Sequence, residues 1–507
     1  MLTKIFSATV VGIDAEIVEV EVDILPGLPA VIVVGLPDTA VKESRERVKS
    51  AIKNSQAIFP VSRVAVNLAP ADLPKVGSLF DLPIAVSILV NSGQLVFDAS
   101  ATIFLGELAL DGSVRPVPGV LPIALSARRR GFKKIILSAD NADEAALAKG
   151  LEVIPVKSLK ETIAHLQGVK VIAPHPPKDI RHLAKDFAEG TDIKNIRGQE
   201  HAKRALEIAA AGGHNLLMTG PPGSGKTMLA RAFATILPRL SETEILEVTK
   251  IYSVAGQLAG SKELITTRPF RSPHHTASAV SLVGGGSVPR PGEISMAHRG
   301  VLFLDELPEF SKSVLESLRQ PLEDGVVTVT RAAGALTFPA RFMLVAAQNP
   351  CPCGYYNDPI KNCVCSPASI LRYNKKISGP LLDRIDLHVE VPRVSYEKIS
   401  QDQEGESSLA VRGRVEAARL LQRKRFGQEG ADIQTNAEMG SEEIKQFCQL
   451  DRPAQEVLKA ALSSMRLSAR AYYRILKISR TIADLKAQPN ITAENVAEAL
   501  QYRPKEE

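Results

Sequence analysis

The chain has 507 residues, of which 45% are hydrophobic and 23% charged, and its 62 basic and 56 acidic residues leave a net charge of +6. Such a length predicts roughly two to four domains with sizeable cores. The mildly basic charge permits an anionic partner such as nucleic acid without requiring one. No apolar run is long enough to span a membrane, acidic residues come too early for a signal peptide, and five cysteines do not suggest a secreted disulfide scaffold. We therefore expect a cytoplasmic protein with no membrane partner.

Residues 1–170 are predicted to form an α+β domain. Val18, Val20 and Val22 alternate with acidic residues, which is the pattern of a half-buried strand. Further apolar and helical patterns predict strands at 31–34 and 64–68, helices at 39–55 and 80–90, a hairpin formed by 103–110 and 114–117, and alternating helices and strands to about 166. Proline-rich residues 174–178 predict a linker, which we place at 171–190.

The second domain, predicted over 191–394, is organised around a glycine-rich loop between an apolar strand and a helical pattern. The loop consists of Gly220, Pro221, Pro222, Gly223, Ser224, Gly225, Lys226 and Thr227. Its glycines let backbone N–H groups face a polyphosphate, while Lys226 is placed to reach the β- and γ-phosphates and Thr227 to bind Mg²⁺. The alternative is a glycine-rich turn before an ordinary helix. The agreement of loop, lysine, hydroxyl and flanks favours a site for ATP and Mg²⁺.

Polar residues that follow later apolar strands supply further chemistry. Asp305 and Glu306 come directly after the strand at 301–304. There Asp305 could hold Mg²⁺ through its waters, and Glu306 could polarise the attacking water. Asn349 follows the strand at 342–346 and is the expected polar sensor of the γ-phosphate.

Two arginines are further candidates for the site. Arg384 lies at an apolar helix end, where the alternative role is a salt bridge to Asp383 or Asp386. Arg470 opens a helix within 395–507, a segment whose apolar spacing near 3.6 residues predicts a helical lid.

Two insertions lie within the second domain. The first contains Arg290 and the pair His274 and His275, for which we favour a structural role over a metal site because adjacent side chains point in different directions. The second, at 326–338, alternates valine with threonine before Arg331, which predicts a β-hairpin with a basic shoulder. Arg290 and Arg331 are candidate contacts to DNA phosphates, and the alternative is an ordinary exposed hairpin.

Four cysteines form two C-x-C pairs in a predicted insert at 349–370, namely Cys351, Cys353, Cys363 and Cys365. Four thiolates can close a tetrahedral Zn²⁺ site, and zinc would order a loop that is poor in core residues. The alternative is four reduced thiols in a mobile loop. Cys448 stands apart and is expected in a core.

The order of these motifs along the chain resembles that of the AAA+ ATPases, in particular their magnesium-chelatase-like and MCM-like branch. The motifs are, in order, the phosphate loop, the Asp-Glu strand, Asn349, Arg384 and Arg470. The resemblance implies that Arg384 is an arginine finger acting on a neighbour's nucleotide and that Arg470 is the second sensor. It also implies that both insertions face a central pore. A finger acting between subunits requires an oligomer, for which a ring is the natural closure.

The amino-terminal segment carries a second resemblance. Residues 106–112 and 114–117 resemble the proteolytic domain of Lon-type proteases, a ribosomal S5 domain 2-like fold, and 74–78 resembles the stretch around their nucleophilic serine. Leu121 and Ile123 stand where that pattern has lysines, and Ser78 sits one position early. Because a serine without its activating base is inert, we expect a proteolytically inactive domain.

Nearly the whole chain resembles the ComM/YifB family. The resemblance implies a hexameric ATP hydrolase that binds single-stranded or branched DNA and drives branch migration during integration of transforming DNA, with a recombinase as a candidate partner. Two alternatives stay open: a chelatase-type metal-insertion motor, whose family lacks the Lon-like domain and the cysteine insert, and a protein-remodelling ring or peptidase. The expected fold class is α/β, an AAA+ core with a helical lid preceded by a Lon-like α+β domain.

Overall fold

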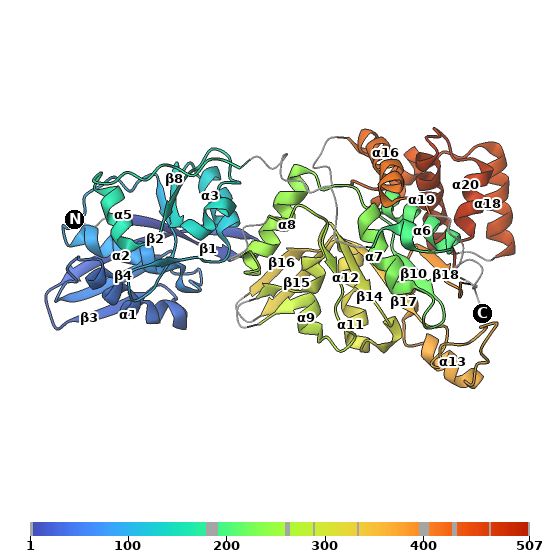
Figure 1. Ribbon diagram of the computed structural model, residues 1–507, viewed down its shortest axis with the longest axis horizontal. Coiled ribbons are helices and arrows are strands. Elements are labelled where there is room, and N and C mark those ends of the chain that lie inside the picture. Colours follow the sequence, from blue (N-terminus) through green and yellow to red (C-terminus); the bar gives the residue numbers. More distant parts are fainter. Residues whose placement is uncertain are drawn as a thin grey trace.

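The computed structural model describes residues 4–178, 191–258, 264–286, 289–331, 334–394, 405–427, 433–465 and 468–504. Figure 1 shows three parts in a row: an amino-terminal α+β domain in blue and teal, a central α/β core in green and yellow, and a helical lid in orange and red. The predicted fold class, an α/β phosphate-loop core with a helical lid after an α+β domain, is confirmed. Within the described residues, no helix is both long and apolar enough to cross a membrane.

Among the described residues, a seven-stranded mixed sheet forms the amino-terminal domain, in the order β3-β4-β2-β1-β5-β8-β9. Its strands are β1 (Lys4–Val11), β2 (Asp14–Leu25), β3 (Ala30–Val34), β4 (Arg63–Ala69), β5 (Thr102–Phe104), β8 (Lys134–Ser138) and β9 (Glu152–Val156). The helices of the domain are α1 (Thr39–Asn54), α2 (Asp81–Asn91), α3 (Val120–Arg129), α4 (Ala142–Ala145) and α5 (Leu159–Leu166). Val18, Val20 and Val22 are fully buried, as their alternation predicts.

The hairpin predicted from 103–110 and 114–117 is confirmed around its turn, but its first strand is broken rather than continuous. β5 stays in the main sheet, whereas β6 (Glu107–Leu108) leaves it and pairs only with β7 (Val114–Arg115). At the break, the Gly106 N–H donates to the Leu79 carbonyl at 3.1 Å. The backbone there is bonded to a neighbouring turn, so it cannot also continue the ladder of the sheet.

The first residues of the predicted linker pack against the amino-terminal domain. The backbone of His175 pairs with Val153 of β9, and the Asp143 carboxylate lies 3.0 Å from the His175 ring and 3.3 Å from the Lys178 ammonium. These residues therefore stay with the domain beyond the predicted end at 170. The rest of the predicted linker, residues 179–190, lies outside the described part of the chain.

A five-stranded parallel sheet forms the described part of the core, in the order β11-β14-β17-β10-β18. Its strands are β10 (Leu216–Thr219), β11 (Phe270–Arg271), β14 (Val301–Leu304), β17 (Met343–Gln348) and β18 (Leu387–Glu390). Every residue of β14 is buried, which is the continuous apolar pattern of a strand covered on both faces. Helices α6 (Glu200–Gly212) and α7 (Lys226–Ile236) share an apolar core with this sheet.

The two insertions pack together beside the sheet. The first contains α9 (Ala279–Val283), β12 (Gly284–Gly285), β13 (Arg290–Pro291) and α10 (Glu293–Met296), and the second is the hairpin of β15 (Val326–Arg331) and β16 (Gly334–Pro339). Leu282 of the first and Val327 and Phe338 of the second are buried in one apolar cluster, together with α11 (Lys312–Ser317). Figure 1 shows α9, β15 and β16 in the same region of the core.

The lid is helical, as the periodicity predicts. Its helices are α16 (Ser408–Phe426), α17 (Ser441–Phe447), α18 (Arg452–Ser464), α19 (Ala469–Leu485) and α20 (Ala493–Leu500). Arg419 and Gln422 of α16 donate to the carbonyls of Ala210 and Ala211 at the end of α6. These bonds satisfy carbonyl groups that have no partner within α6 and attach the lid to the core.

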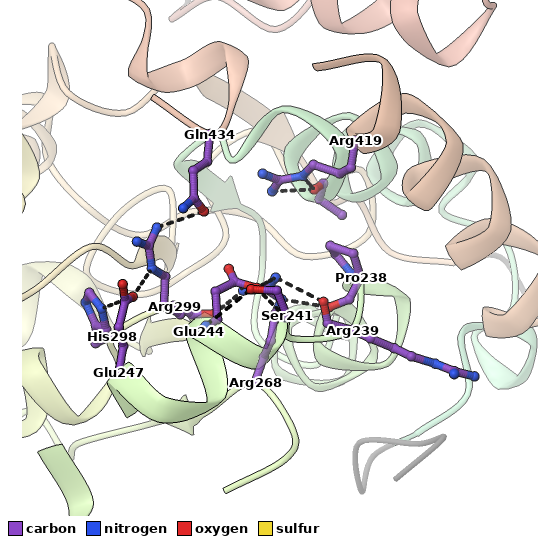
Figure 2. A network of polar contacts seen from close by, with 11 residues as sticks. Pro238, Arg239, Ser241, Glu244, Glu247, Arg268, His298, Arg299, Arg419 and Gln434 are labelled. Carbon is purple, nitrogen blue, oxygen red and sulfur yellow. Dashed lines mark hydrogen bonds and ion pairs between the residues drawn. The ribbon is translucent and has the colours of Figure 1, made fainter. Parts of the chain in front are cut away.

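A polar network at the base of the lid involves helix α8 (Glu242–Val254) (Figure 2). The Arg268 guanidinium pairs with both oxygens of buried Glu244, each at 3.0 Å. The Arg299 guanidinium bonds Glu247 at 2.8 Å and Gln434 at 3.1 Å, which links α8 to the lid segment. Removing one partner of a buried pair typically costs about 3–5 kcal/mol because the other charge stays buried. The Arg268–Glu244 pair therefore fixes α8 within the core, and the Arg299–Gln434 bond connects this network to the lid segment.

Helix α8 also contacts the amino-terminal domain. Leu121 and Leu147 of that domain form an apolar cluster with Leu240 and Ile245. The Gly119 N–H, at the start of α3, donates to the Ser253 carbonyl near the end of α8 at 3.1 Å. The amino-terminal domain therefore contacts the core on the same helix that carries the network beneath the lid.

Candidate active site

The phosphate loop lies between the carboxyl end of β10 and the start of α7. Gly223 and Gly225 have φ angles of 76° and 93°, a left-handed conformation that strains other residues. A Cβ on Gly220 would lie 2.1 Å from the Val391 carbonyl oxygen, so only glycine fits there. The loop thus exposes backbone N–H groups at a helix amino terminus, where the helix dipole also favours an anion.

The Lys226 ammonium turns back toward the loop. Its Nζ donates to the carbonyls of Gly220 at 2.7 Å and Pro221 at 3.0 Å, and to Oδ1 of Asn349 at 3.3 Å. Burial lowers the pKa of Lys226, and the negative charges of Asp305 and Glu306 oppose that shift. All three hydrogen-bond acceptors are neutral, so phosphate oxygens in the loop would give this buried cation a charge partner.

Thr227 and Asp305 meet across the site. The Thr227 hydroxyl donates to Oδ2 of Asp305 at 2.8 Å, and the Glu306 N–H donates to Oδ1 at 3.0 Å. A hydroxyl and a carboxylate side by side are hard oxygen ligands of the kind that Mg²⁺ prefers, so this pair fits the ion that the loop predicts. Glu306 has a φ of 53°, an uncommon conformation for a residue with a side chain, and its carboxyl group is half exposed.

The structure does not bring the two predicted arginines to this loop. Arg384 pairs with Glu323 of α12 (Arg319–Asp324) and its carbonyl accepts from the Asn215 side chain at 2.9 Å. Arg470 lies 3.5 Å from the Asp383 carboxylate. Asn215 directly precedes β10, so its partner Arg384 lies at the amino edge of the sheet. The phosphate loop follows β10, so Lys226 lies at the carboxyl edge. The strand between them is about 13 Å long.

The alternative partners predicted for Arg384 were therefore wrong. Asp383 pairs instead with Arg470 and Arg474, and Asp386 pairs with His214 at 3.0 Å. Arg384 also lines a cavity of about 510 Å³ at the amino edge, between the core and the lid.

The two predicted DNA contacts lie on the insertions. Arg290 is exposed in the short strand β13. Arg331 ends β15 and is paired with Gly334 across the hairpin, but its side chain lies outside the described part of the structure.

Four cysteine sulfurs gather beside the site. The sulfurs of Cys351, Cys353, Cys363 and Cys365 all lie within 4.8 Å of one another. The Cys351–Cys353, Cys351–Cys363 and Cys353–Cys363 separations are 3.4, 3.7 and 3.6 Å. Four sulfurs at the usual Zn–S distance in a tetrahedron are about 3.8 Å apart, so the spacing fits zinc. Backbone N–H groups of Tyr356 and Cys365 point at two of the sulfurs, an arrangement that orients metal ligands. Cys448 is buried in the core of the lid, as predicted.

The loop that carries the cysteines lies against the phosphate loop. A Cβ on Gly354 would approach Cδ of Pro222 to 2.6 Å, so the backbone at Gly354 packs directly against the Pro222 ring. Cys351 follows Asn349 by two residues, and Asn349 bonds Lys226. On the far side, Asp358 pairs with Arg393, just after β18, at 2.8 Å. The cysteine loop is therefore part of the wall of the site.

Two residues near the site were not predicted to take part in it: Gln199 was not considered, and His275 was assigned only a structural role. Gln199, with a φ of 61°, donates from Nε2 to the carbonyls of Ser224 at 3.3 Å and Pro392 at 2.5 Å, which joins the phosphate loop to the chain after β18. The Nδ1 atom of His275 lies 3.4 Å from Oε2 of Glu306. Both contacts join segments that are far apart in the chain, so no local sequence pattern predicts them.

The region that resembles a protease lacks a serine–lysine pair in its described hydrogen bonds. The Ser78 hydroxyl donates to the Glu107 carboxylate, and the fully buried Lys75 donates to the Pro70 carbonyl. Leu121 and Ile123 are fully buried.

Comparisons with known proteins match the whole chain. The family described as magnesium chelatase, subunit ChlI, matches residues 192–399, a further subunit ChlI description matches 20–141, and its C-terminal description matches 405–503. Competence protein ComM of Haemophilus influenzae is 44% identical over 508 residues, which cover 99% of this chain and 97% of that protein. Uncharacterized protein YifB of Escherichia coli is 45% identical over 504 residues, with the same coverage. The magnesium-chelatase 67 kDa subunit of Chlorobaculum parvum is 32% identical over 160 residues, 31% of this chain and 23% of that subunit.

Proposed function

Because this chain belongs to the ComM/YifB family of magnesium-chelatase-related proteins, we propose that it is an ATP hydrolase that works as a hexameric ring and couples turnover to movement along DNA. The observation that carries the proposal is the division of the ATPase residues between two edges of one sheet. Lys226 and Thr227 lie at the carboxyl edge and Arg384 at the amino edge. A neighbour in a ring would bring its own Arg384 to the phosphate loop.

Hydrolysis would use residues from both subunits. The phosphates of ATP would lie against the loop N–H groups and Lys226, and Thr227 with Asp305 would hold Mg²⁺, which neutralises phosphate charge. Glu306 would accept a proton from the attacking water, and Asn349 would orient the γ-phosphate end. An arginine supplied by a neighbour is worth about 10³–10⁵ in rate, so a single chain would turn over slowly.

We place the DNA on the two insertions. Arg290 is exposed on the first, and Arg331 ends a strand of the second. The insertions share a buried, close-packed apolar cluster, so a displacement of one insertion would also displace the other. Contacts to phosphates would be blind to sequence and weakened by salt. The name of the competence relative supports a role in competence. We extend that role to the integration of transforming DNA by branch migration in the cytoplasm, with a recombinase as partner. The contacts of Ser78 support a domain without peptidase activity.

The test is the ATPase rate without DNA and with single-stranded, branched or duplex DNA over a salt series. We expect single-stranded or branched DNA to raise the rate, and the rise to fade as salt increases, because each phosphate contact releases counterions. Lys226→Ala serves as the control for contaminating activity. An ATPase rate that no DNA form changes at low salt would contradict the DNA-coupled motor and favour a metal-insertion or protein-remodelling ATPase.

We also propose that the four clustered cysteines hold one Zn²⁺ ion per chain. The sulfur spacing and the N–H groups directed at the sulfurs support this ligand set. Protein prepared with zinc should contain about one ion per chain by elemental analysis. The double substitution Cys353→Ser with Cys365→Ser should lose the ion, while Cys448→Ser should retain it. Equal metal content in all three proteins, or none in the unaltered protein, would contradict the proposal.

A further inference from the structure

A cavity of about 510 Å³ lies at the amino edge of the core sheet, between the core and the lid. Sites for small molecules usually have volumes of about 300–1,000 Å³, so this cavity has the size of such a site. Asn215, which directly precedes β10, is part of its lining, whereas Lys226 lies beyond the other end of β10. The cavity is therefore separate from the phosphate loop of the same chain.

Charged side chains make up much of the lining, with six basic and five acidic residues. Three of the acidic residues already pair with basic side chains, namely Glu244 with Arg268, Glu323 with Arg384 and Asp386 with His214. Arg299 pairs with Glu247, which is outside the lining, and Glu438 accepts two backbone N–H groups. The charge that a ligand would meet is therefore set by the basic groups that have no carboxylate to bond.

Two basic side chains of the lid line the cavity without such a partner. Nε and Nη2 of Arg419, on α16, both donate to the Ala210 carbonyl, at 3.1 and 2.9 Å. The Lys477 ammonium, on α19, donates to the Ala437 carbonyl at 2.8 Å. Both acceptors are neutral, so neither charge is balanced by a hydrogen-bonded carboxylate among the described residues.

The surroundings of these two groups disfavour their positive charge. Burial lowers the pKa of Arg419 to about 9, and the nearby Arg268 charge adds to the shift. Burial also lowers the pKa of Lys477, although the negative charges of Asp386 and Glu438 oppose the shift. An anion between the two groups would stabilise both charged forms. Phosphate oxygens suit this role because arginine and lysine bind them through strong, charge-assisted hydrogen bonds.

The cavity has walls from two parts of the molecule. In Figure 2, Arg419 comes from the lid helix α16, whereas Arg268 and Arg299 come from the core near α8. Lys477 adds a second charge from the lid, and Arg384 lines the core side. A ligand with several phosphate groups would therefore bridge the lid and the core, and it would lie near the arginine that we propose to act on a neighbour's nucleotide.

We propose that this cavity is a second anion site, which binds a small molecule that carries two or more linked phosphate groups. Arg419 and Lys477 hold the phosphates from the lid side. The volume of the cavity suits a small molecule better than a strand of DNA. Because the occupant holds the lid to the core beside Arg384, its binding is a means of regulating turnover. The inference goes beyond the proposed function and does not depend on movement along DNA.

The probe for this site is inorganic tripolyphosphate, titrated calorimetrically into the full chain at low salt without Mg²⁺. Every protein in the comparison carries Lys226→Ala, which weakens competing binding at the phosphate loop of this chain or of a neighbour. We expect saturable binding of about one tripolyphosphate per chain. Adding Lys477→Gln should weaken binding by about tenfold or more, because the new side chain can still donate to the Ala437 carbonyl but has lost its charge.

A second variant and a matched control complete the comparison. Arg419→Gln, which can still donate to the Ala210 carbonyl, should weaken binding to a similar extent. Lys486→Gln is the control, since Lys486 follows the end of α19 and pairs with Glu494 outside the cavity, and it should bind as tightly as the parent protein. Thermal unfolding without the probe checks that each variant is folded, and the Arg419 variant decides the test if the Lys477 variant is not.

Three results would overturn the inference. One is the absence of saturable binding. Another is equal affinity in Lys477→Gln, Arg419→Gln and Lys486→Gln, which would place the probe elsewhere on the chain. The third is displacement of the probe by a single-stranded oligonucleotide whose own binding needs Lys477, which would assign the cavity to DNA phosphates. Failure of the proposed function is recognised separately, because the titration involves neither ATP turnover nor its stimulation by DNA.

Discussion

Replacing Gly354 with alanine tests whether the cysteine loop sets the shape of the phosphate loop. The new Cβ would lie 2.6 Å from Cδ and 2.7 Å from Cγ of Pro222. Carbon atoms pack comfortably at about 3.5–4.0 Å, so the Pro222 ring must retreat by about 1 Å. A displacement of that size in a binding loop can cost up to about 10²-fold, and we expect the Kd for ATP to rise about tenfold, or about 1.4 kcal/mol.

Gly150→Ala is the matched control for this substitution. Gly354 and Gly150 have φ angles of 85° and 94°, so alanine at either position meets the same backbone strain of about 1–2 kcal/mol. At Gly150 nothing lies within 4 Å of the new Cβ. Calorimetric titration with a non-hydrolysable ATP analogue would measure both affinities, with thermal unfolding as a check on strain. Equal affinities in the two variants would refute the close contact between the loops.

Three further predictions concern the base, the hairpin and the core beneath the lid. Glu306→Gln should abolish hydrolysis but keep ATP-dependent assembly in sedimentation experiments, and normal turnover would remove Glu306 as the base. Arg331→Ala should weaken stimulation by DNA while basal turnover persists, and equal loss of both would contradict a DNA contact. Burial and the nearby Arg474 charge lower the pKa of His388 from 6.5 to about 4, so the unfolded chain takes up this proton first as the pH falls. That proton uptake should remove about 3 kcal/mol of stability between roughly pH 7 and pH 4, and His388→Gln should flatten this part of the profile in urea unfolding. An unchanged profile would contradict the shift.

The nucleotide site was predictable because its residues follow local patterns. A buried strand, a glycine loop with Lys226 and Thr227, and a second strand before Asp305 each carry their signal within a few residues. The strand β1 was missed because Ser7 and Thr9 are fully buried in the middle of the sheet, so its sequence lacks the alternation of a half-buried strand.

Contacts between segments that are distant in the chain could not be predicted from the sequence. The partner of Arg384 is Glu323, not one of the acidic residues beside it in the chain, because the fold brings α12 to the turn that follows the short helix Gly379–Leu382. The contact of His275 with Glu306 depends on the pairing of β11 with β14, which a two-residue strand does not reveal in advance. Adjacent histidines suggested only structure or metal, and neither reading includes a carboxylate partner 31 residues away.

Mixing two inactive variants tests the shared active site most directly. Lys226→Ala removes the phosphate contact and Arg384→Ala removes the arginine at the opposite edge, so each variant alone should hydrolyse ATP very slowly. In an equal mixture that exchanges subunits, roughly a quarter of the interfaces would join an intact phosphate loop to an intact Arg384 of its neighbour. We predict that turnover, and its stimulation by single-stranded DNA, returns to that extent. No recovery in mixed oligomers of demonstrated composition would contradict a site completed between subunits.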